Sequence, residues 1–420
     1  MKPRTYFFTA AVLVTFSLSA GAEDWPQWRG PGRTGLSQET GLLKEWPKAG
    51  PKMLWHLTDI GEGYATPSVV GGRLYMLSNR GMDNEFVQAL SVEDGKQLWS
   101  TRVGKVGNPD QEPHYPMARS TPTTDGELLY ALGSDGDLVC LETATGKLRW
   151  QKSLRADFGG VPGQWAYAES PLVDGDQVIV TPSGKEAAMV ALNKKTGALI
   201  WKSAVPGGDP AAYSSAMVVE AAGHRQYVQF VNKGVVGVDA KTGTFLWRYD
   251  RTGKSVAANM PTPVVRDSYV YTIAQHIGGG LIHLVPNGQG VNAEEVYFTR
   301  GLPNAVGGSV LLGDTLYGAN EVEYVAADFL TGKIKWHEEG IGAGSTFYAD
   351  GLLFVHGENG DVALVSAAED GYHEHGRFSP PGQPKHVGGR EKAWAYPVVA
   401  GGRLYIRDLQ NLWCYDVKAK

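Results

Sequence analysis

The sequence predicts an all-β protein: one β-propeller of eight blades, with four antiparallel strands in each blade. Two repeating patterns and the two ends of the chain indicate this fold class. The first pattern ends in Trp and recurs roughly every 45 to 50 residues, a period typical of propeller blades. The second pattern precedes each copy of the first, and the chain ends carry matching halves of one further copy.

Each copy of the first pattern predicts the third and fourth strands of a blade. An apolar run forms one strand, and a Thr-Gly or Asp-Gly pair forms the hairpin turn because Gly tolerates positive φ. The residues up to the Trp form the return strand. The complete copies span residues 89–99, 140–150, 191–201, 237–247 and 326–336.

The Trp that ends each copy is predicted to dock one blade on another. An indole buries on the order of 200 Å², so a single blade cannot bury it alone, whereas a stack of blades can. The small residue that opens each copy is expected to leave room for the Trp of a neighbouring unit. The predicted docking residues are Trp99, Trp150, Trp201, Trp247 and Trp336.

The second pattern predicts the first two strands of each blade. It consists of a short entry strand, a tight turn and an apolar strand. Its eight copies lie at residues 65–75, 120–130, 169–180, 214–228, 260–271, 308–318, 345–355 and 395–406. Two of the eight units then end imperfectly, because residues 281–298 lack the Trp signature and His375 stands where the seventh Trp is expected.

The two ends of the chain supply two halves of one blade. After Trp413-Cys-Tyr-Asp416 the sequence stops without a return strand, and Lys52–Trp55 reads as a return strand without its hairpin. Pairing these segments would close the ring and remove the exposed sheet edges that invite aggregation. The alternative, an open β-solenoid, would leave both halves unpaired.

The chain divides into three predicted regions. Residues 1–22 read as an export signal, with a basic start, a short apolar run and a cleavage site at Ala20-Gly21-Ala22. That run is too short to cross a membrane, and no membrane span is expected elsewhere. Residues 23–50 are expected to form an N-terminal arm packed on the propeller, because their Trp residues would be costly in water. Residues 51–420 are expected to form the single propeller domain.

The net charge of the chain argues against a nucleic-acid partner. The formal net charge is −5, and nucleic-acid binding normally needs a basic surface, so no nucleic-acid partner is expected.

The sequence contains two cysteines, Cys140 and Cys414, which both stand at the small position of the repeat. Because a free Cys behaves as a small hydrophobe, we expect two buried, unpaired thiols rather than a disulfide.

The frame Ala-x-Asp-x-x-Thr-Gly-Lys-x-x-Trp resembles the tryptophan-docking repeat of the pyrroloquinoline quinone (PQQ) repeat propellers. The match extends over nearly all of the chain beyond residue 22, and Trp25-Pro-Gln-Trp-Arg-Gly-Pro31 is similar to the start of secreted bacterial members. The resemblance implies an eight-bladed propeller and bacterial export. The family includes quinoprotein alcohol dehydrogenases and a lipoprotein scaffold of outer-membrane protein assembly.

The sequence departs from both of these family activities. The dehydrogenases carry adjacent cysteines that form a disulfide over the cofactor, whereas Cys140 and Cys414 are far apart. They are usually longer, and no local motif here matches their calcium-binding Glu and Asn or their catalytic Asp. The scaffold has a lipid-bearing Cys after its signal, where this chain has Glu23. The sequence thus predicts no metal site and leaves PQQ with calcium open as a cofactor.

The predicted ligand site is the mouth of the central channel, because the residues before each entry strand reach it. Aromatic and hydrogen-bonding groups are frequent there and suit a planar or sugar-like ligand; a water-filled channel lined by ordinary loop residues is the alternative. The predicted ligand-binding residues are Tyr64, Arg119, Trp165, Glu169, Asn259, His276, Asn320 and Trp394. Neighbouring positions add His114, Tyr115, Tyr167, Ser214, Asn304, Glu321, Ser345, Lys392 and Tyr396.

Arg119 and Glu169 allow two interpretations. As functional residues, Arg119 would hold a carboxylate in bidentate geometry, and Glu169 would act as a base or metal ligand. As structural residues they would form an ion pair between neighbouring blades, which is the interpretation that we favour. The segments 135–137 and 358–361 lack the ligand series of a calcium loop and are expected to be turns.

The sequence contains no nucleophile elbow, no His-Glu-x-x-His pair and no phosphate-binding loop. The leading hypothesis is therefore an exported, non-catalytic and monomeric propeller, periplasmic or extracellular, that binds a protein or carbohydrate partner through one face. The first alternative is a PQQ-dependent oxidoreductase acting on alcohols or sugars. The second is a scaffold in cell-envelope assembly.

Overall fold

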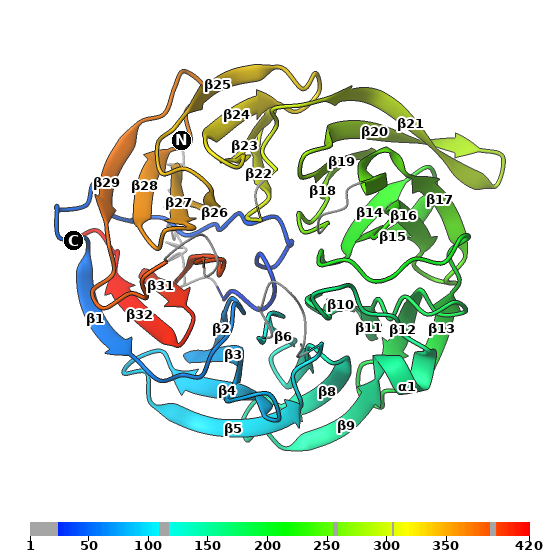
Figure 1. Ribbon diagram of the computed structural model, residues 1–420, viewed down its shortest axis with the longest axis horizontal. Coiled ribbons are helices and arrows are strands. Elements are labelled where there is room, and N and C mark those ends of the chain that lie inside the picture. The colour runs from blue at the N-terminus through cyan, green and yellow to red at the C-terminus, as the bar shows by residue number, and fades with distance from the viewer. Residues whose placement is uncertain (1–23, 109–116, 255–258, 305, 387–391) are drawn as a thin grey trace, which may run out of the picture.

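Eight four-stranded antiparallel sheets surround a central axis in the computed structural model (Figure 1). The structure describes residues 24–108, 117–254, 259–304, 306–386 and 392–420. The expected signal, residues 1–22, and the site candidates His114 and Tyr115 lie outside these ranges. The arrangement confirms the predicted eight-bladed β-propeller.

In blades 1 to 7 the strands run from the central channel to the rim in chain order, and in blade 8 the outermost strand comes from the start of the chain (Figure 1). Blades 1 and 2 consist of β2 (Ser68–Val70), β3 (Arg73–Asn79), β4 (Glu85–Ser91) and β5 (Gln97–Gly104), then β6 (Thr123–Thr124), β7 (Leu128–Leu132), β8 (Asp137–Glu142) and β9 (Leu148–Ser153). Blades 3 and 4 consist of β10 (Leu172–Asp174), β11 (Gln177–Val180), β12 (Met189–Asn193) and β13 (Leu199–Ser203), then β14 (Met217–Ala221), β15 (His224–Val231), β16 (Gly234–Asp239) and β17 (Phe245–Tyr249).

The second half of the ring repeats this order. Blades 5 and 6 consist of β18 (Val264–Arg266), β19 (Tyr269–Ala274), β20 (Gly278–Asn287) and β21 (Gly290–Thr299), then β22 (Ser309–Leu312), β23 (Thr315–Ala319), β24 (Tyr324–Asp328) and β25 (Ile334–Glu338). Blades 7 and 8 consist of β26 (Gly344–Ala349), β27 (Leu352–Gly357), β28 (Val362–Ser366) and β29 (Glu374–Phe378), then β30 (Val398–Ala400), β31 (Arg403–Asp408), β32 (Asn411–Asp416) and β1 (Lys52–Leu57). One short helix, α1 (Leu154–Phe158), and a 3-10 turn, η1 (Arg251–Lys254), complete the described elements.

Blade 3 illustrates why the repeat needs its Thr-Gly turn. Gly197 has a φ of +68°, and its N–H donates to the carbonyl of Asn193 at 2.8 Å. The side chain of Asn193 in turn accepts the N–H of Thr196 at 3.1 Å. A Cβ on Gly197 would lie 2.8 Å from the ring of Trp150 in the preceding blade. Gly is therefore required both for the backbone conformation and for the space.

With the exception of Trp247, the ring N–H of each docking Trp is paired with a turn of the neighbouring blade. Trp150 Nε1 donates to the carbonyl of Lys194 at 2.9 Å, three residues before Gly197. The equivalent bonds run from Trp55 to Val92, from Trp99 to Thr143, from Trp201 to Ala240 and from Trp336 to Ala368. Trp247 instead donates to Gln226 Oε1 of its own blade, because the next blade has the long β20–β21 hairpin in place of the short turn.

The small residues of the repeat lie under the Trp of their own blade. The register pairs Ala191 with Trp201 and Gly237 with Trp247, and a Cβ on Gly237 would lie 2.0 Å from Trp247 Nε1. The expectation that they make room for a neighbour's Trp is wrong. The neighbour's Trp packs on the turn glycine.

A tyrosine replaces the docking Trp in blade 5. Tyr297 pairs with Leu281 in the register that Trp occupies elsewhere. Its hydroxyl donates to the carbonyl of Phe329 at 2.9 Å, and its ring packs on Gly332 of the next turn. The docking contact is thus preserved without the sequence signature.

The N-terminal arm brings a Trp to blade 7. Gly376, rather than the expected His375, occupies the Trp register opposite Leu364. A Cβ on Gly376 would lie 2.7 Å from the Cβ of Trp46, whose N–H donates to the carbonyl of His375. The ring of Trp46 packs on Phe354 and Phe378, so an indole from a segment far away in sequence covers the blade that lacks a Trp of its own.

The ring closes as predicted. β1 pairs with β32 in antiparallel register, with Lys52 opposite Asp416 and Trp55 opposite Cys414. Both cysteines are free and buried, as expected. In the described part of the chain, no helix is long and apolar enough to cross a membrane.

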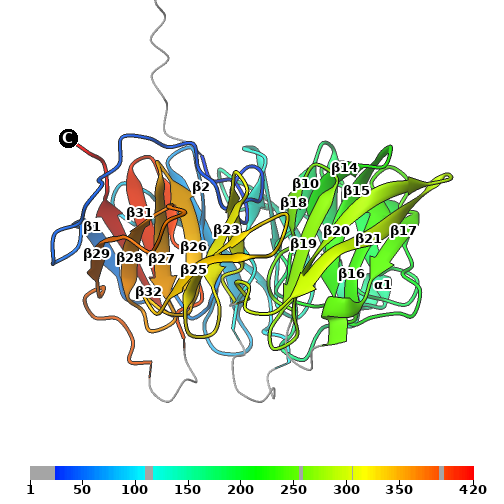
Figure 2. The same cartoon turned by 90° about the horizontal axis from the view of Figure 1, so that it is seen from above.

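Residues 24–50 cross one end of the central channel (Figures 1 and 2). Their hydrogen bonds reach seven of the eight blades. The partners of the arm are Val69 in blade 1, Thr124 in blade 2, Ser170 and Pro171 before blade 3, Thr262 before blade 5, Ser309 in blade 6, Tyr348 in blade 7, and Gly401, Gly402 and Val417 in blade 8. The arm thus closes this end of the channel, and Trp25, Leu42 and Trp46 join the hydrophobic core that spans the closure of the ring.

Candidate functional site

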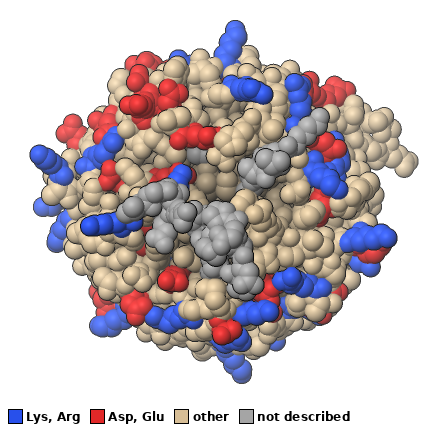
Figure 3. All heavy atoms as spheres, in the orientation of Figure 1, with Lys and Arg blue, Asp and Glu red and all other residues tan. Residues whose placement is uncertain are grey.

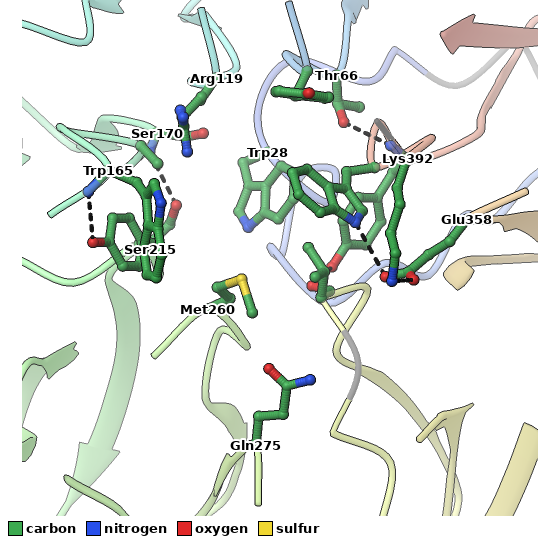
Figure 4. A pocket seen from close by; sticks show the side chains of 16 residues that line it. Trp28, Thr66, Arg119, Trp165, Ser170, Ser215, Met260, Gln275, Glu358 and Lys392 are labelled. Carbon is green, nitrogen blue, oxygen red and sulfur yellow. Dashed lines mark hydrogen bonds and ion pairs between the residues drawn. The ribbon is translucent and has the colours of Figure 1, made fainter. Parts of the chain in front are cut away.

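A pocket of about 330 Å³ lies in the centre of the ring (Figure 4), and we call it the channel pocket. Its aromatic lining consists of Trp28, Tyr64, Trp165, Tyr213, Trp394 and Tyr396. Its polar and charged lining consists of Thr66, Arg119, Ser170, Ser215, Gln275, Glu358 and Lys392, with Met260 among the apolar groups. These residues come from the arm and from most blades, so the pocket depends on the closed ring.

Trp28 brings the N-terminal arm into the pocket. Its Nε1 donates to Thr262 Oγ1 at 3.2 Å, and its ring meets Tyr396 edge to face with centroids 4.5 Å apart. These contacts hold the half-buried indole between the two sides of the pocket (Figure 4). Since the arm closes the channel behind Trp28, the pocket is blind at this end.

One side of the pocket is built by Glu358, Lys392 and Trp394. Glu358 accepts hydrogen bonds from Lys392 Nζ and from Trp394 Nε1, the latter at 3.1 Å. Trp394 also packs against Tyr64 with ring centroids 4.9 Å apart. The carboxylate of Glu358 is therefore engaged by two donors of the pocket wall.

Arg119 reaches the pocket from the opposite side (Figure 4). Its Nε donates to the carbonyl of Met117 at 3.3 Å, and burial lowers the pKa of its guanidinium. The nearby carboxyl of Glu85 lies behind the lining, where Oε2 accepts from the backbone and hydroxyl of Ser134 at 2.9 and 2.6 Å. Burial raises the pKa of Glu85 to about 7.

A series of hydroxyls ties the inner ends of neighbouring blades together. The N–H of Tyr396 donates to Thr66 Oγ1 at 2.9 Å, that of Thr121 to Ser170 Oγ at 2.9 Å, and that of Ser170 to Ser215 Oγ at 3.0 Å. These bonds fix the positions of three hydroxyl oxygens around the pocket. The Ser/Thr-Pro entry segments of the sequence supply two of them.

Trp165 presents an unsatisfied donor at the pocket. Its backbone N–H donates to the hydroxyl of Tyr213 at 3.0 Å, and the two rings pack with centroids 5.7 Å apart. The indole Nε1 is buried and has no partner among the described residues. Because buried donors are normally paired, this N–H is a candidate contact for a ligand.

The structure brings four of the eight predicted site residues together in the channel pocket: Tyr64, Arg119, Trp165 and Trp394. Glu169 is buried outside the lining, where it accepts from Thr181 and Gln229. Burial raises its pKa to about 7, although Thr181 and the cation of Arg33 act to lower it. Within the described residues Glu169 and Arg119 do not form the expected ion pair.

The other three predicted residues lie away from the pocket lining. Asn259 is buried and donates to the carbonyls of Val231 and Asn232. His276 is exposed and pairs with Glu321 at 2.8 Å. Asn320 accepts the N–H groups of the turn that follows it. Each of these side chains has a local structural contact.

Sequence reasoning missed two main parts of the pocket. Trp28 was assigned to the arm without a place in the site, and Glu358 was interpreted as turn chemistry. Ser214 and Ser345 were the hydroxyl residues expected near the mouth, whereas the hydroxyls that line the pocket belong to Thr66, Ser170 and Ser215. Lys392 and Tyr396 had been placed near the mouth, and both line the pocket.

The described residues do not fit the calcium ion that the family resemblance implies beside PQQ. Calcium takes six to eight oxygen ligands, largely from carboxylates. In the described ranges no cluster of three or more His, Cys, Asp and Glu side chains could hold a metal. Glu358, the single carboxylate of the described lining, is already engaged by Lys392 and Trp394. We therefore derive no step through this cofactor.

The face in Figure 3 carries interspersed charges. Acidic and basic side chains alternate around the visible part of the ring, without a large area of one sign. This pattern gives no electrostatic footprint for a polyanion such as nucleic acid.

A family model described as "Outer membrane protein assembly factor BamB" matches residues 30–161 and 83–338 of the chain. Among curated proteins, tetrathionate hydrolase of Acidithiobacillus ferrooxidans is 23% identical over 287 residues, which cover 66% of this chain and 53% of that protein. Outer membrane protein assembly factor BamB of Salmonella typhimurium is 24% identical over 123 residues, which cover 29% of this chain and 28% of that protein. The chain thus matches only part of the length of each relative.

Solved structures share the propeller fold. BamB from Moraxella catarrhalis superposes with a TM-score of 0.60 at 16% identity, covering 87% of this chain and 98% of that one. A quinohemoprotein alcohol dehydrogenase from Pseudomonas putida HK5 gives a TM-score of 0.54 at 14% identity, covering 94% and 80%. At these identities the likeness concerns the fold alone. The family model matches more than half of this chain. The chain therefore belongs to the PQQ-like β-propeller family whose model is described as "Outer membrane protein assembly factor BamB".

Proposed function

We propose that this chain is an exported, non-catalytic binding protein whose channel pocket holds a small saccharide. The observation that carries the proposal is a blind pocket in which six aromatic rings surround hydroxyl, amide and charged groups. Sugar rings present apolar C–H faces that pack on aromatic rings, and their hydroxyls need polar partners at defined positions. The channel pocket offers both kinds of group.

The size and construction of the pocket support a small ligand. Ligand pockets usually enclose about 300–1,000 Å³, and the channel pocket, at about 330 Å³, lies at the small end of that range. Trp28 and Trp394 are held by hydrogen bonds from their indole N–H groups, so their faces are fixed before a ligand arrives. A preorganised site loses less entropy on binding.

Export is part of the proposal. The apolar run and cleavage pattern of residues 1–22 support it, and so does membership of a family whose description refers to outer-membrane protein assembly. That description and the likeness to BamB structures also favour a second candidate function. In this function the chain binds a protein partner of the cell envelope through one face.

Calorimetric titration of the purified chain with neutral and acidic mono- and oligosaccharides tests the proposal. We expect saturable binding to at least one of them, and we expect Trp28→Ala to weaken it at least about tenfold (about 1.4 kcal/mol). The control is Leu98→Ala, at an exposed position of β5 on the rim, which should bind like the wild type.

Two other outcomes would favour a different function for this chain. Absence of binding to every saccharide, together with a stoichiometric complex with one envelope protein, would replace the proposal by the second candidate. Saturable binding of PQQ, with or without calcium, in a parallel titration would favour a quinone-dependent oxidoreductase, and dye-linked assays on alcohols and sugars would follow.

A further inference from the structure

Three hydrogen-bond donors that find no acceptor among the described residues lie together on one side of the channel pocket. They are the indole N–H of Trp165 and the hydroxyls of Ser170 and Ser215 (Figure 4). Trp165 precedes blade 3, Ser170 stands just before β10, and Ser215 stands just before β14. Two neighbouring blades therefore build this group, which we call the donor cluster.

The indole N–H of Trp165 needs an acceptor that the described protein does not supply. The nitrogen is buried and has no hydrogen-bond partner, although the backbone N–H of the same residue donates to the hydroxyl of Tyr213. An indole N–H can only donate, and a buried donor without an acceptor is destabilising. This position therefore suits an acceptor oxygen of a ligand.

The two seryl hydroxyls of the donor cluster are positioned by the backbone. Ser170 Oγ accepts the N–H of Thr121 at 2.9 Å, and Ser215 Oγ accepts the N–H of Ser170 at 3.0 Å. Each oxygen uses one lone pair in this way and keeps its proton and its second lone pair for another partner. The donor cluster can thus donate more than one hydrogen bond to a ligand and still accept one from it.

The surroundings of the donor cluster favour a neutral acceptor with an apolar group beside it. Met260 lines the pocket between Ser215 and Trp28 in the view of Figure 4. All three donors are neutral, and burial of an ionised acceptor is costly unless a charge compensates it. Arg119 is not assigned to the ligand, because it already has contacts within the protein. A carbonyl that carries a methyl group fits this arrangement.

We propose that the channel pocket recognises an N-acetylated amino sugar, with the acetamido carbonyl at the donor cluster and its methyl group on Met260. This inference rests on the proposed saccharide binding and specifies its class. The carbonyl oxygen has two lone pairs, which receive the indole N–H of Trp165 and a seryl hydroxyl, while the sugar ring packs on Trp28. A hydroxyl at the same ring carbon ends closer to the ring and offers no methyl group, so a plain hexose makes neither contact.

Calorimetric titration of the wild-type chain with N-acetylglucosamine, N-acetylgalactosamine, glucose, galactose and glucuronic acid tests the class. We expect at least one N-acetylated sugar to bind about tenfold more tightly than its parent hexose, because it adds a hydrogen bond and a buried methyl group.

Trp165→Phe tests the assigned donor, because it keeps an aromatic ring and removes the N–H. It should weaken binding of the N-acetylated sugar about three- to tenfold and leave the affinity for the hexose within about twofold of the wild type. Trp28→Phe is the matched control, since the indole N–H of Trp28 is already bonded to Thr262. It should change both affinities by similar factors and leave the preference unchanged.

Met260→Ala provides a second variant if Trp165→Phe fails to fold. It should weaken binding of N-acetylglucosamine about fourfold, which corresponds to one buried methyl group. Binding of N-formylglucosamine, which lacks the methyl group, should stay near that of the wild type. Equal losses for the two sugars would contradict the placement of the methyl group on Met260.

The outcomes separate this inference from the function on which it rests. Equal binding of the N-acetylated sugars and their parent hexoses by the wild type would overturn the acetamido class and leave saccharide binding intact. No binding of any saccharide would overturn both. Tighter binding of glucuronic acid than of either N-acetylated sugar would contradict a neutral acceptor, and an unchanged preference in Trp165→Phe would contradict the role of Trp165.

Discussion

Arg407 shows how a single buried side chain joins the last blade to the first. Its Nη1 donates to the carbonyls of Ala65 and Leu77 at 3.0 and 2.7 Å, and its Nη2 donates to Ser78 Oγ at 3.0 Å. The side chain is fully buried, and the planar guanidinium satisfies several acceptors that no other side-chain type could reach together. Arg407 is therefore a structural residue of the closure.

Arg407→Met should destabilise the protein by on the order of 3 kcal/mol or more, because buried acceptors left without a donor cost about 1–3 kcal/mol each. Chemical denaturation followed by Trp fluorescence measures the change. Arg80→Met provides the comparison, since exposed ion pairs contribute at most about 1 kcal/mol. Equal stability losses for the two variants would contradict the structural role of Arg407.

Glu85 is a buried carboxyl that responds to pH. Burial raises its pKa to about 7, whereas hydrogen bonds from Ser134 and the cation of Arg119 act to lower it and Asp137 acts to raise it. In the unfolded chain a Glu titrates near 4.3. Between these values the folded state holds the proton more tightly, so this group's contribution to stability falls as pH rises from about 4 to 7 and is constant above.

Glu85→Gln should remove that dependence. We expect the variant to lose less stability than the wild type between pH 5 and pH 7.5, by an amount on the order of 2–3 kcal/mol. Melting temperatures at several pH values within this range measure it. Glu186→Gln, at an exposed position, should follow the wild-type profile, and a parallel profile for Glu85→Gln would rule out the titration of Glu85 as the cause.

At the scale of the elements, the β-hairpin turn is the unit that assembles the blades. The same Gly that gives the turn its positive φ offers a flat surface to the Trp of the preceding blade, as Gly197 does for Trp150. One residue thus serves the local conformation and the packing between blades. This double use explains why Thr-Gly recurs with Trp in the sequence.

Gly197→Ala separates these two roles when it is compared with Gly175→Ala. Both glycines have positive φ, +68° and +58°, but a Cβ on Gly175 would meet no atom within 4 Å. Gly175→Ala should cost about 1 kcal/mol for the backbone alone. Gly197→Ala should cost about 1–3 kcal/mol more, because its Cβ would displace Trp150. Thermal unfolding of both variants measures the difference, and equal losses would show that the Trp contact contributes nothing.

The sequence determines the blades better than it determines the site. Local patterns such as Asp-x-x-Thr-Gly determine the hairpins, so the number of blades and the order of their strands could be predicted. Ring closure could be predicted because the two chain ends carry the two halves of one blade. The docking role of Tyr297 could not be predicted because it depends on the strand register, and the place of Trp46 on blade 7 could not be predicted because it depends on the path of the arm. The place of Trp28 in the pocket also depends on the path of the arm. The role of Glu358 could not be predicted because this loop residue contacts Lys392 and Trp394, which are distant in the sequence.

At the scale of the whole molecule, the segment before blade 1, residues 24–57, has two separate structural roles. β1 completes blade 8 through its pairing with β32. The arm before it crosses one end of the channel and contributes Trp28 to the pocket and Trp46 to blade 7. Closure of the ring and closure of the channel are therefore carried by adjacent segments, and truncation can remove the arm alone or the arm together with β1.

Two truncations distinguish these contributions. A chain that begins at residue 51 keeps β1, so it should stay monomeric and folded, with a lower melting temperature because Trp25 and Trp46 leave the core. A chain that begins at residue 58 lacks β1 and exposes the edge of β32, an apolar strand that contains Trp413 and Tyr415. Because exposed edges pair with other chains, it should associate, as light scattering would detect. A peptide of residues 51–58 should suppress this association, and a monomeric chain without β1 would contradict the role of strand pairing in closing the ring.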